Sequence, residues 1–306
     1  MTGPLSLCMA LFYVGQLAAP SQTPEEETKS ALQARRLELF QHEAADYRIF
    51  RDAEHAVELK FRDEPVFLWT NPTRYHGQEG ATHGAVFAWT HRGCAEVIGT
   101  IFVHPEKGRL VVSHEFHSLS PVVLEPVRTS GSANRWSPRG HLPRLVVEGV
   151  DPPAPSPSAR LVQLRSIARR FTAHSVTLRG ERWDLRLLPQ PAYRYQSDNL
   201  ELIDGAVFIF ASSAGTDPEV ILVVEAAKMA DEAQWQYGVA RFSDANLYIE
   251  YDAKQVWTSV RGGENTHDHN PSYTFRYYRD KVVDALSDGE GEETDRKQRS
   301  RQAEGE

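Results

Sequence analysis

The chain contains one apolar motif twice. The segment His83-Gly84-Ala85-Val86-Phe87-Ala88-Trp89 recurs as Asp204-Gly205-Ala206-Val207-Phe208-Ile209-Phe210, with Phe87 and Phe208 lying 121 positions apart. Each copy leads into a polar turn and then into the same triplet, Glu96-Val97-Ile98 and Glu219-Val220-Ile221. An internal repeat restricts the architecture more than any local pattern does. This one predicts two units, each of about 120 residues, that fold by the same rules.

Weaker matches flank the motif in the same order. Val57-Glu58-Leu59 corresponds to Val176-Thr177-Leu178, and Trp136 corresponds to Trp257. The spacing between the copies changes only in polar, turn-like segments, where folded proteins tolerate insertions. Chance similarity among β-rich segments is the alternative explanation.

Length and charge restrict the class of protein. The chain has 306 residues, enough for two compact units, and a net charge of −8. A general nucleic-acid or anionic-membrane binder would be expected to carry a basic surface. We therefore expect no nucleic-acid partner.

The N-terminal segment resembles a secretory leader. Residues 1–23 contain no charged side chain, and Leu5 to Val14 is an apolar run that is too short to span a membrane. We expect a signal peptide over 1–22, export to the periplasm, cell envelope or exterior, and no transmembrane segment. No Lys or Arg precedes the run, so a buried N-terminal helix or a mis-assigned start is the alternative. Without the leader Cys94 would be the single cysteine, which excludes an intrachain disulfide.

Two helices are expected, one at the start of each unit. Thr23-Pro24-Glu25-Glu26 has the residues of a helix N-terminus, and this helix should run to about Tyr47. The Pro-rich run 151–157 predicts a stiff linker between a first unit at 23–150 and a second at 158–286. Ser158 could cap the second helix. Its apolar stripe is formed by Leu161, Leu164, Ala168 and Phe171, and Arg160, Arg165, Arg169 and Arg170 are expected on its solvated face.

The remaining segments predict antiparallel strands joined by tight turns. In the first unit they fall at about 55–61, 65–70, 84–90, 95–103, 109–116 and 143–149. In the second unit they fall at about 176–180, 183–188, 204–211, 218–225, 235–242, 246–251, 255–260 and 272–279. Residues 287–306 are polar and charged and predict a disordered tail. The expected fold class is α+β, a β-rich tandem duplication of a helix-plus-antiparallel-meander unit in two lobes.

Repeated polar residues form the candidate binding site. An Arg before the motif and a Glu after it could form one charge-assisted pair per unit, which is either a structural clasp or part of a cleft for polar or anionic ligands. We expect such a cleft between the lobes, since pockets favour such junctions. The candidate binding residues are Arg74, Tyr75, Glu96, Arg194, Tyr195 and Glu219.

No catalytic, metal or cofactor motif stands out. His267-Asp268-His269 and the His114-Glu115-Phe116-His117 segment each lack the three or four convergent ligands that zinc requires. A phosphate loop and a nucleophile elbow are also missing from the sequence. The alternative function is a hydrolase whose acid/base site uses Glu96, Glu219 or His114, which would require carboxylates at the right separation. The six Trp are expected mostly in the core, with exposed sugar- or peptide-binding platforms as the alternative.

Several segments together resemble a family of exported bacterial proteins of unknown function. They are Phe67-Leu68-Trp69-Thr70-Asn71-Pro72, Gly84-Ala85-Val86-Phe87-Ala88-Trp89-Thr90, Glu115-Phe116-His117-Ser118-Leu119-Ser120 and Arg186-Leu187-Leu188-Pro189-Gln190-Pro191. The resemblance covers about residues 35–260 and implies bacterial export without assigning any activity. With the repeat, it leads us to expect an exported binding or scaffolding protein. Its partner would be a small polar ligand, a glycan or an envelope protein.

Overall fold

The computed structural model describes residues 24–72, 81–130, 136, 138, 140–177, 179–196, 201–213, 215–229, 232–260 and 273–286. These residues form a β-rich fold with two α-helices, α1 (Pro24–Ala45) and α2 (Pro157–Ala168), and a short 3-10 helix, η1 (Asp284–Leu286). None of the helices in this part of the chain is both long and apolar enough to cross a membrane.

The first sheet is antiparallel and is built around the first copy of the motif. Its strands are β2 (Lys60–Phe61), β3 (Phe67–Asn71), β4 (Thr82–His91), β5 (Cys94–Glu106), β6 (Arg109–Ser118) and β17 (Tyr273–Val282). They follow the order β17-β6-β5-β4-β2, and β3 also pairs with β4. A separate two-stranded ribbon joins β1 (Tyr47–Phe50) to β7 (Glu125–Arg128).

The second sheet is larger and contains the second copy of the motif. Its strands are β8 (Leu145–Val146), β9 (Phe171–Val176), β10 (Arg182–Leu187), β11 (Tyr193–Tyr195), β12 (Leu202–Ala211), β13 (Pro218–Met229), β14 (Glu232–Arg241), β15 (Asn246–Tyr251) and β16 (Lys254–Ser259). They follow the order β16-β15-β9-β10-β12-β13-β14-β8, and β11 also pairs with β12.

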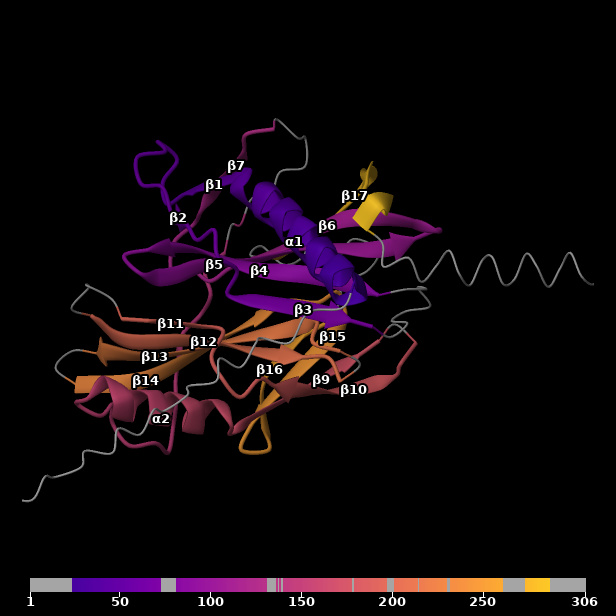
Figure 1. The fold of residues 1–306 in the computed structure, drawn as a ribbon. Coiled ribbons are helices and arrows are strands. Elements are labelled where there is room, and N and C mark those ends of the chain that lie inside the picture. The colour runs from indigo at the N-terminus through magenta and orange to yellow at the C-terminus, as the bar shows by residue number, and fades with distance from the viewer. Residues whose placement is uncertain are drawn as a thin grey trace, which may run out of the picture.

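The two sheets pack face to face and each carries one helix on its outer face (Figure 1). Side chains alternate between the faces of a strand. Val86 and Ala88 of β4 therefore join Val207 and Ile209 of β12 in a shared central core. The intervening Phe87 and Trp89 pack in a second core with α1. The strands β12 and β13 likewise contribute Phe208 and Leu222 to a third core with α2. The two units expected as lobes thus meet along a continuous apolar layer.

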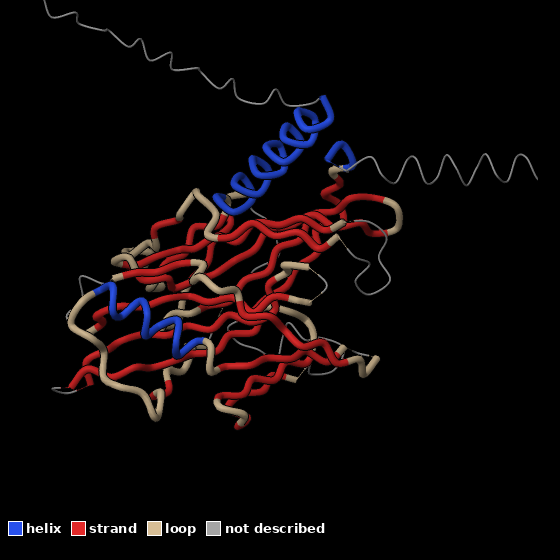
Figure 2. The backbone as a smooth tube through the Cα atoms, turned by 60° about the horizontal axis from the view of Figure 1, so that its bottom comes forward, coloured by secondary structure: helices blue, strands red, loops and turns tan. Residues whose placement is uncertain are grey.

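Several strand pairs in the first half of the chain correspond to strand pairs in the second half. Phe87 pairs with Gly99 between β4 and β5, and Phe208 pairs with Leu222 between β12 and β13. The pairs β1·β7, β2·β4 and β3·β4 likewise match β9·β15, β10·β12 and β11·β12. Figure 2 shows the strands of both layers in a second view.

Each half of the chain sends its last strand to the other sheet. β8, which precedes α2, pairs with β14 at the edge of the second sheet. β17, which follows the second half, returns to pair with β6 of the first sheet. Buried arginines on the helices hold both returning segments: Arg36 of α1 donates to the Leu286 carbonyl (2.9 Å) and Arg160 of α2 donates to the Pro155 carbonyl (2.7 Å). The two halves are therefore interlocked by reciprocal strand exchange.

The structure corrects some of the predicted boundaries. Helix α2 begins at Pro157, and its N-cap is Ser156 instead of the expected Ser158. The Ser156 hydroxyl accepts from the Ala159 N–H at 3.3 Å. Strand β1 begins at Tyr47, where the first helix was expected to end. Strand β9 begins at Phe171, which was expected in the apolar stripe of the second helix. The strand expected at 143–149 is reduced to β8. The expected leader and tail lie outside the described residues.

Candidate functional site

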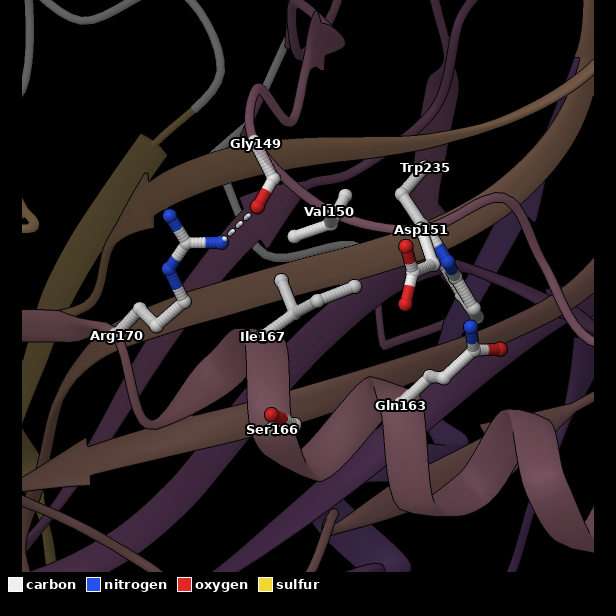
Figure 3. A pocket seen from close by; sticks show the side chains of 8 residues that line it. All are labelled: Gly149, Val150, Asp151, Gln163, Ser166, Ile167, Arg170 and Trp235. Atoms are coloured by element: carbon white, nitrogen blue, oxygen red, sulfur yellow. Dashed lines mark hydrogen bonds between the residues drawn. The ribbon is translucent and has the colours of Figure 1, made fainter.

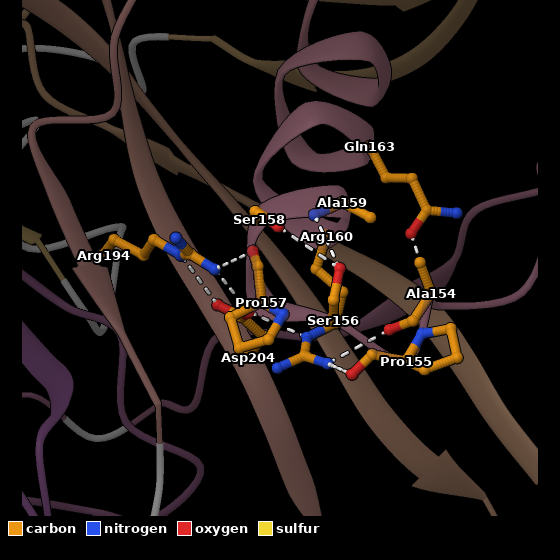
Figure 4. Close-up of polar contacts among 10 residues, drawn as sticks. All are labelled: Ala154, Pro155, Ser156, Pro157, Ser158, Ala159, Arg160, Gln163, Arg194 and Asp204. Atoms are coloured by element: carbon orange, nitrogen blue, oxygen red, sulfur yellow. Dashed lines mark hydrogen bonds and ion pairs between the residues drawn. The ribbon is translucent and has the colours of Figure 1, made fainter.

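The six residues predicted to form a binding site do not all come together. Arg74 and Tyr75 lie outside the described residues. Glu96, Tyr195 and Glu219 are buried. Arg194 extends from β11 toward α2, where it donates to Asp204 of β12 at 2.8 Å (Figure 4). Arg194 therefore forms its ion pair with Asp204 instead of the expected Glu219.

Glu96 and Tyr195 each belong to a polar cluster at the central core. The Glu96 carboxylate accepts from the Arg51 Nε and the Ser120 hydroxyl, both at 3.0 Å. Burial raises the pKa of Glu96, and the nearby Arg51 only partly offsets this effect. The Tyr195 hydroxyl donates to Glu225 at 2.5 Å, and Glu225 also accepts from Arg144. These contacts satisfy buried charge, as expected of structural clasps.

Glu219 lies near other carboxylates. Burial, together with the charges of Glu219 and Glu115, raises the pKa of Asp217 well above its ordinary value. Like charges close together favour protonation of one member. We find no group of three or more metal-ligating side chains suited to a metal ion among the described residues.

The histidine proposed as an acid/base is also inside the protein. The Nδ1 of His114 lies 2.8 Å from the Tyr47 hydroxyl, and its Nε2 lies 3.2 Å from the Glu43 carboxylate. All three side chains are buried, and they connect α1 and β1 to β6. His267 and His269 lie outside the described residues. Trp69, Trp89, Trp136 and Trp235 are buried, which confirms the expected core role for these four.

A recess of about 420 Å³ forms where the linker crosses α2 and β14 (Figure 3). None of the six predicted residues lines it. Its lining residues are Gly149, Val150, Asp151, Gln163, Ser166, Ile167, Arg170 and Trp235. Its volume is within the range of small-molecule sites, roughly 300–1,000 Å³.

The linker wall of the recess is fixed at both ends. At one end Gly149 has a left-handed backbone (φ 67°), and its carbonyl accepts from the Arg170 guanidinium at 2.9 Å. At the other end the Gln163 side chain accepts from the Ala154 N–H (2.8 Å) and donates to the Pro152 carbonyl (2.9 Å). Asp151 lies between these two attachments. The wall is thus held in place by the protein itself, and such preorganisation favours ligand binding.

The two charged residues that line the recess differ in whether they have an ionic partner. Arg170 stacks over the Tyr251 ring, 4.4 Å from its centroid, and donates to both carboxylate oxygens of Asp252. This ion pair raises the pKa of Arg170. Asp151, by contrast, forms no ion pair with a described residue. Within the described part of the chain, the Asp151 carboxylate therefore has no ionic partner.

The floor of the recess contains a buried donor. Trp235 of β14 is 2% exposed, and its indole N–H meets no hydrogen-bond acceptor among the described residues. Buried polar groups are normally hydrogen-bonded, so each exception needs an explanation. The indole nitrogen is itself inaccessible to solvent, so the N–H is not open to a molecule in the recess.

A second recess of about 320 Å³ is lined by residues of β9, β10 and β15. Its polar lining includes His174, Arg182, Asp184 and Glu250, and His174 stacks on Tyr248 with ring centroids 4.8 Å apart. Burial, with the nearby Arg182, lowers the pKa of His174. Arg182 and Asp184 already pair with each other at 2.9 Å on the surface. The first recess, with its larger volume and fixed wall, is the stronger candidate site.

Sequence reasoning missed the first recess because its parts are distant in the chain. Asp151 belongs to the segment interpreted as a linker, and Arg170 to a helix face interpreted as solvated.

We find no match for the chain among protein-family models, curated proteins or solved structures.

Proposed function

We propose that this protein is an exported binding protein whose small polar ligand occupies the recess between the linker, α2 and β14. The fixed linker wall of the recess, held at Gly149 by Arg170 and at Pro152 and Ala154 by Gln163, is the observation that carries this proposal. Export is proposed from the uncharged, apolar N-terminal segment of the sequence.

We further propose that the fold arose by duplication of one unit. The matched strand pairings support this, and so do matched contacts outside the strands. The Leu119 N–H donates to the Glu96 carbonyl and the Phe242 N–H donates to the Glu219 carbonyl, both at 2.8 Å. The Thr129 N–H donates to the Asp46 carbonyl, as the Asp252 N–H does to the Arg170 carbonyl. Chance resemblance among β-rich segments would not produce equivalent contacts at junctions between elements.

The contacts between the two units are also reciprocal. The Tyr193 hydroxyl of β11 donates to the Gly93 carbonyl in the β4–β5 turn at 2.8 Å. In the other direction, the Thr216 N–H in the β12–β13 connection donates to the Thr70 carbonyl of β3 at 3.1 Å. Reciprocal contacts of this kind are those of a two-fold interface between identical subunits. They support descent from a strand-exchanged homodimer that became one chain.

The recess lies where the two units have diverged. The strand registers and helix-end contacts align Trp235 with Val112 and Arg170 with Asp46. The first unit thus has an aliphatic side chain where the second has an indole. At the helix end it has a negative charge where the second unit has a positive one. A site present in one unit is consistent with a binding function acquired after duplication.

A ligand screen with a matched pair of variants tests the binding proposal. Ser166 is an exposed residue of α2 that lines the recess, and Val162 is an exposed residue of the same helix outside it. Ser166→Phe should obstruct the recess, whereas Val162→Phe places the same side chain away from it. A sugar, amino acid, peptide or anion that raises the melting temperature of the wild type and of Val162→Phe, but not of Ser166→Phe, would support the site. Equal stabilisation of all three proteins would place binding elsewhere and refute the proposal.

A further inference from the structure

We infer that the peptide bond between Asp151 and Pro152 is an acid-triggered self-cleavage site in the linker. The inference goes beyond the proposed binding function and does not depend on it. The chain contains the pair Asp-Pro twice, as Asp151-Pro152 and as Asp217-Pro218. An aspartate before a proline can cut its own peptide bond, and the structure places the two pairs in opposite situations. The linker pair is exposed, whereas the other pair is held in the second sheet.

The reaction uses only groups of the linker and water. The protonated Asp151 carboxyl gives its proton to the Pro152 nitrogen, and its oxygen adds to the carbonyl carbon of Asp151 through a five-membered ring. The bond between this carbon and the Pro152 nitrogen breaks, so that Pro152 leaves as a secondary amine and residue 151 becomes a cyclic anhydride. Water then opens the anhydride to two carboxyl groups. A nucleophile fixed so close to its target acts at a very high effective concentration, and the prolyl nitrogen is more basic than that of other peptide bonds.

Asp151 has the freedom that this reaction requires. It is exposed, and its carboxyl group forms no hydrogen bond or ion pair with a described residue (Figure 3). The Asp151 carbonyl likewise accepts no backbone hydrogen bond within the described part of the chain. The carbonyls on either side are bound, that of Gly149 by Arg170 and that of Pro152 by Gln163. The reacting residue is thus an unrestrained link between two fixed points.

The charges around Asp151 do not oppose its protonation. Arg170 is the other charged residue that lines the recess, and it is already bound to Asp252. Glu148, on the same segment as Asp151, is a second exposed acid. The residues that α2 and β14 contribute to the recess do not titrate in mild acid; they are Gln163, Ser166, Ile167 and Trp235. Protonation of the Asp151 carboxyl therefore breaks no ion pair with a described residue.

The second Asp-Pro bond is protected by its place in the sheet. The Asp217 carbonyl accepts from the Ser212 N–H at 2.9 Å. Pro218 is buried at the start of β13 and pairs with Ala211 of β12. Closing the five-membered ring would turn this carbonyl out of its hydrogen bond and displace a buried strand. A missing proton is not what protects this bond, since burial and the neighbouring carboxylates raise the pKa of Asp217 well above its ordinary value.

Cleavage at the linker leaves the two products bound to each other. Strand β8 lies before the cut and pairs with β14 after it, and β17 lies after the cut and pairs with β6 before it. The shared central core also joins the products. The cut falls between the two attachments of the recess wall, at Gly149 and at Ala154. Self-cleavage therefore converts the chain into an interlocked two-chain protein whose recess no longer has a continuous wall.

Incubation of the full chain at about pH 4, where a solvated aspartate is partly protonated, tests the inference. Circular dichroism at the same pH checks that the protein is folded. Mass spectrometry should then find a cut after Asp151 that forms at least about tenfold faster than a cut after Asp217. In urea at this pH the restraint of the sheet is lost, so the two bonds should be cut at similar rates. Without urea, the cut protein should elute from a size-exclusion column as one species of the intact size.

Two variants identify the nucleophile and the leaving group. Asp151→Glu keeps a carboxyl group but needs a larger ring, and Pro152→Ala keeps the carbonyl that Gln163 binds but removes the basic prolyl nitrogen. Each should slow the cut in the linker about tenfold or more. A wild-type rate in Asp151→Glu would overturn the inference. An intact linker in the folded protein, under conditions that cut it in urea, would overturn it as well, and so would equal rates at the two bonds in the folded protein.

Discussion

Replacement of Asp204 should strongly destabilise the protein, because this carboxylate balances two arginines inside the fold. Asp204 is fully buried on β12. It accepts from the Arg160 Nε at 2.8 Å, from the Arg194 Nε at 3.1 Å and from the Arg194 Nη2 at 2.8 Å (Figure 4). Asp204→Asn keeps the shape of the side chain but removes its charge. Arg160, which was expected on a solvated helix face, would then be a buried cation without a counter-ion.

The size of the effect follows from burial. Removing one member of a buried ion pair typically costs about 3–5 kcal/mol, because the remaining charge stays desolvated. With a urea dependence of about 3 kcal/mol/M for a chain of this length, the unfolding midpoint should fall by about 1–1.7 M at an unchanged slope. Asp184→Asn is the control, since it removes a carboxylate from an ion pair with Arg182 whose side chains are both mainly exposed, and it should cost less than about 1 kcal/mol.

A double variant identifies the cause of the destabilisation. Arg160→Met removes the buried cation that Asp204→Asn leaves behind, so the two changes together should cost clearly less than the sum of the single changes. Urea unfolding followed by circular dichroism measures all the variants. A cost for Asp204→Asn as small as that of the surface control, or strict additivity with Arg160→Met, would refute the reasoning.

Three further predictions follow from the fold. Burial lowers the pKa of His117 to about 4, so the unfolded chain binds a proton that the folded chain excludes between pH 6.5 and 4, and stability should fall by about 3 kcal/mol over this range. His117→Gln should flatten this pH dependence in urea unfolding, and an unchanged slope would contradict it. Gly84→Ala and Gly205→Ala each place a Cβ 2.4 Å from an aromatic ring, so both should cost about 1–3 kcal/mol in the same assay, and a neutral result at either position would count against the equivalence of the two sheets. Fragments 24–151 and 152–286, co-refolded and analysed by size-exclusion chromatography, should form a one-to-one complex because each completes the other's sheet, whereas two folded monomers would argue against strand exchange.

The central hairpins could be predicted from the sequence because local signals agree there. The long apolar runs of β4–β5 and β12–β13 surround compact polar turns, and the repeat marks them as equivalent. The short strands were harder to find. Phe171 fits the apolar stripe of a helix and equally the first position of β9, and residues at a helix–strand junction do not show which period applies.

The candidate site depends on tertiary contacts that no local pattern reveals. Asp252 lies 82 residues from Arg170 in sequence, and Trp235 reaches the linker only because β8 pairs with the second sheet. Sequence periodicity therefore assigned Arg170 to a solvated face. The replacement of Val112 in the first copy by Trp235 in the second also becomes visible only once the strand registers align the two copies.

The late position of β17 in the chain affects how the protein can fold during synthesis. Strand β6 ends at Ser118, but its partner begins only at Tyr273. At about 5–20 residues per second, a ribosome needs roughly 8–30 seconds to make the intervening chain. During that interval the first sheet has an open edge, which is a hazard for aggregation. The first sheet would thus stay incomplete until almost all of the described chain has been made.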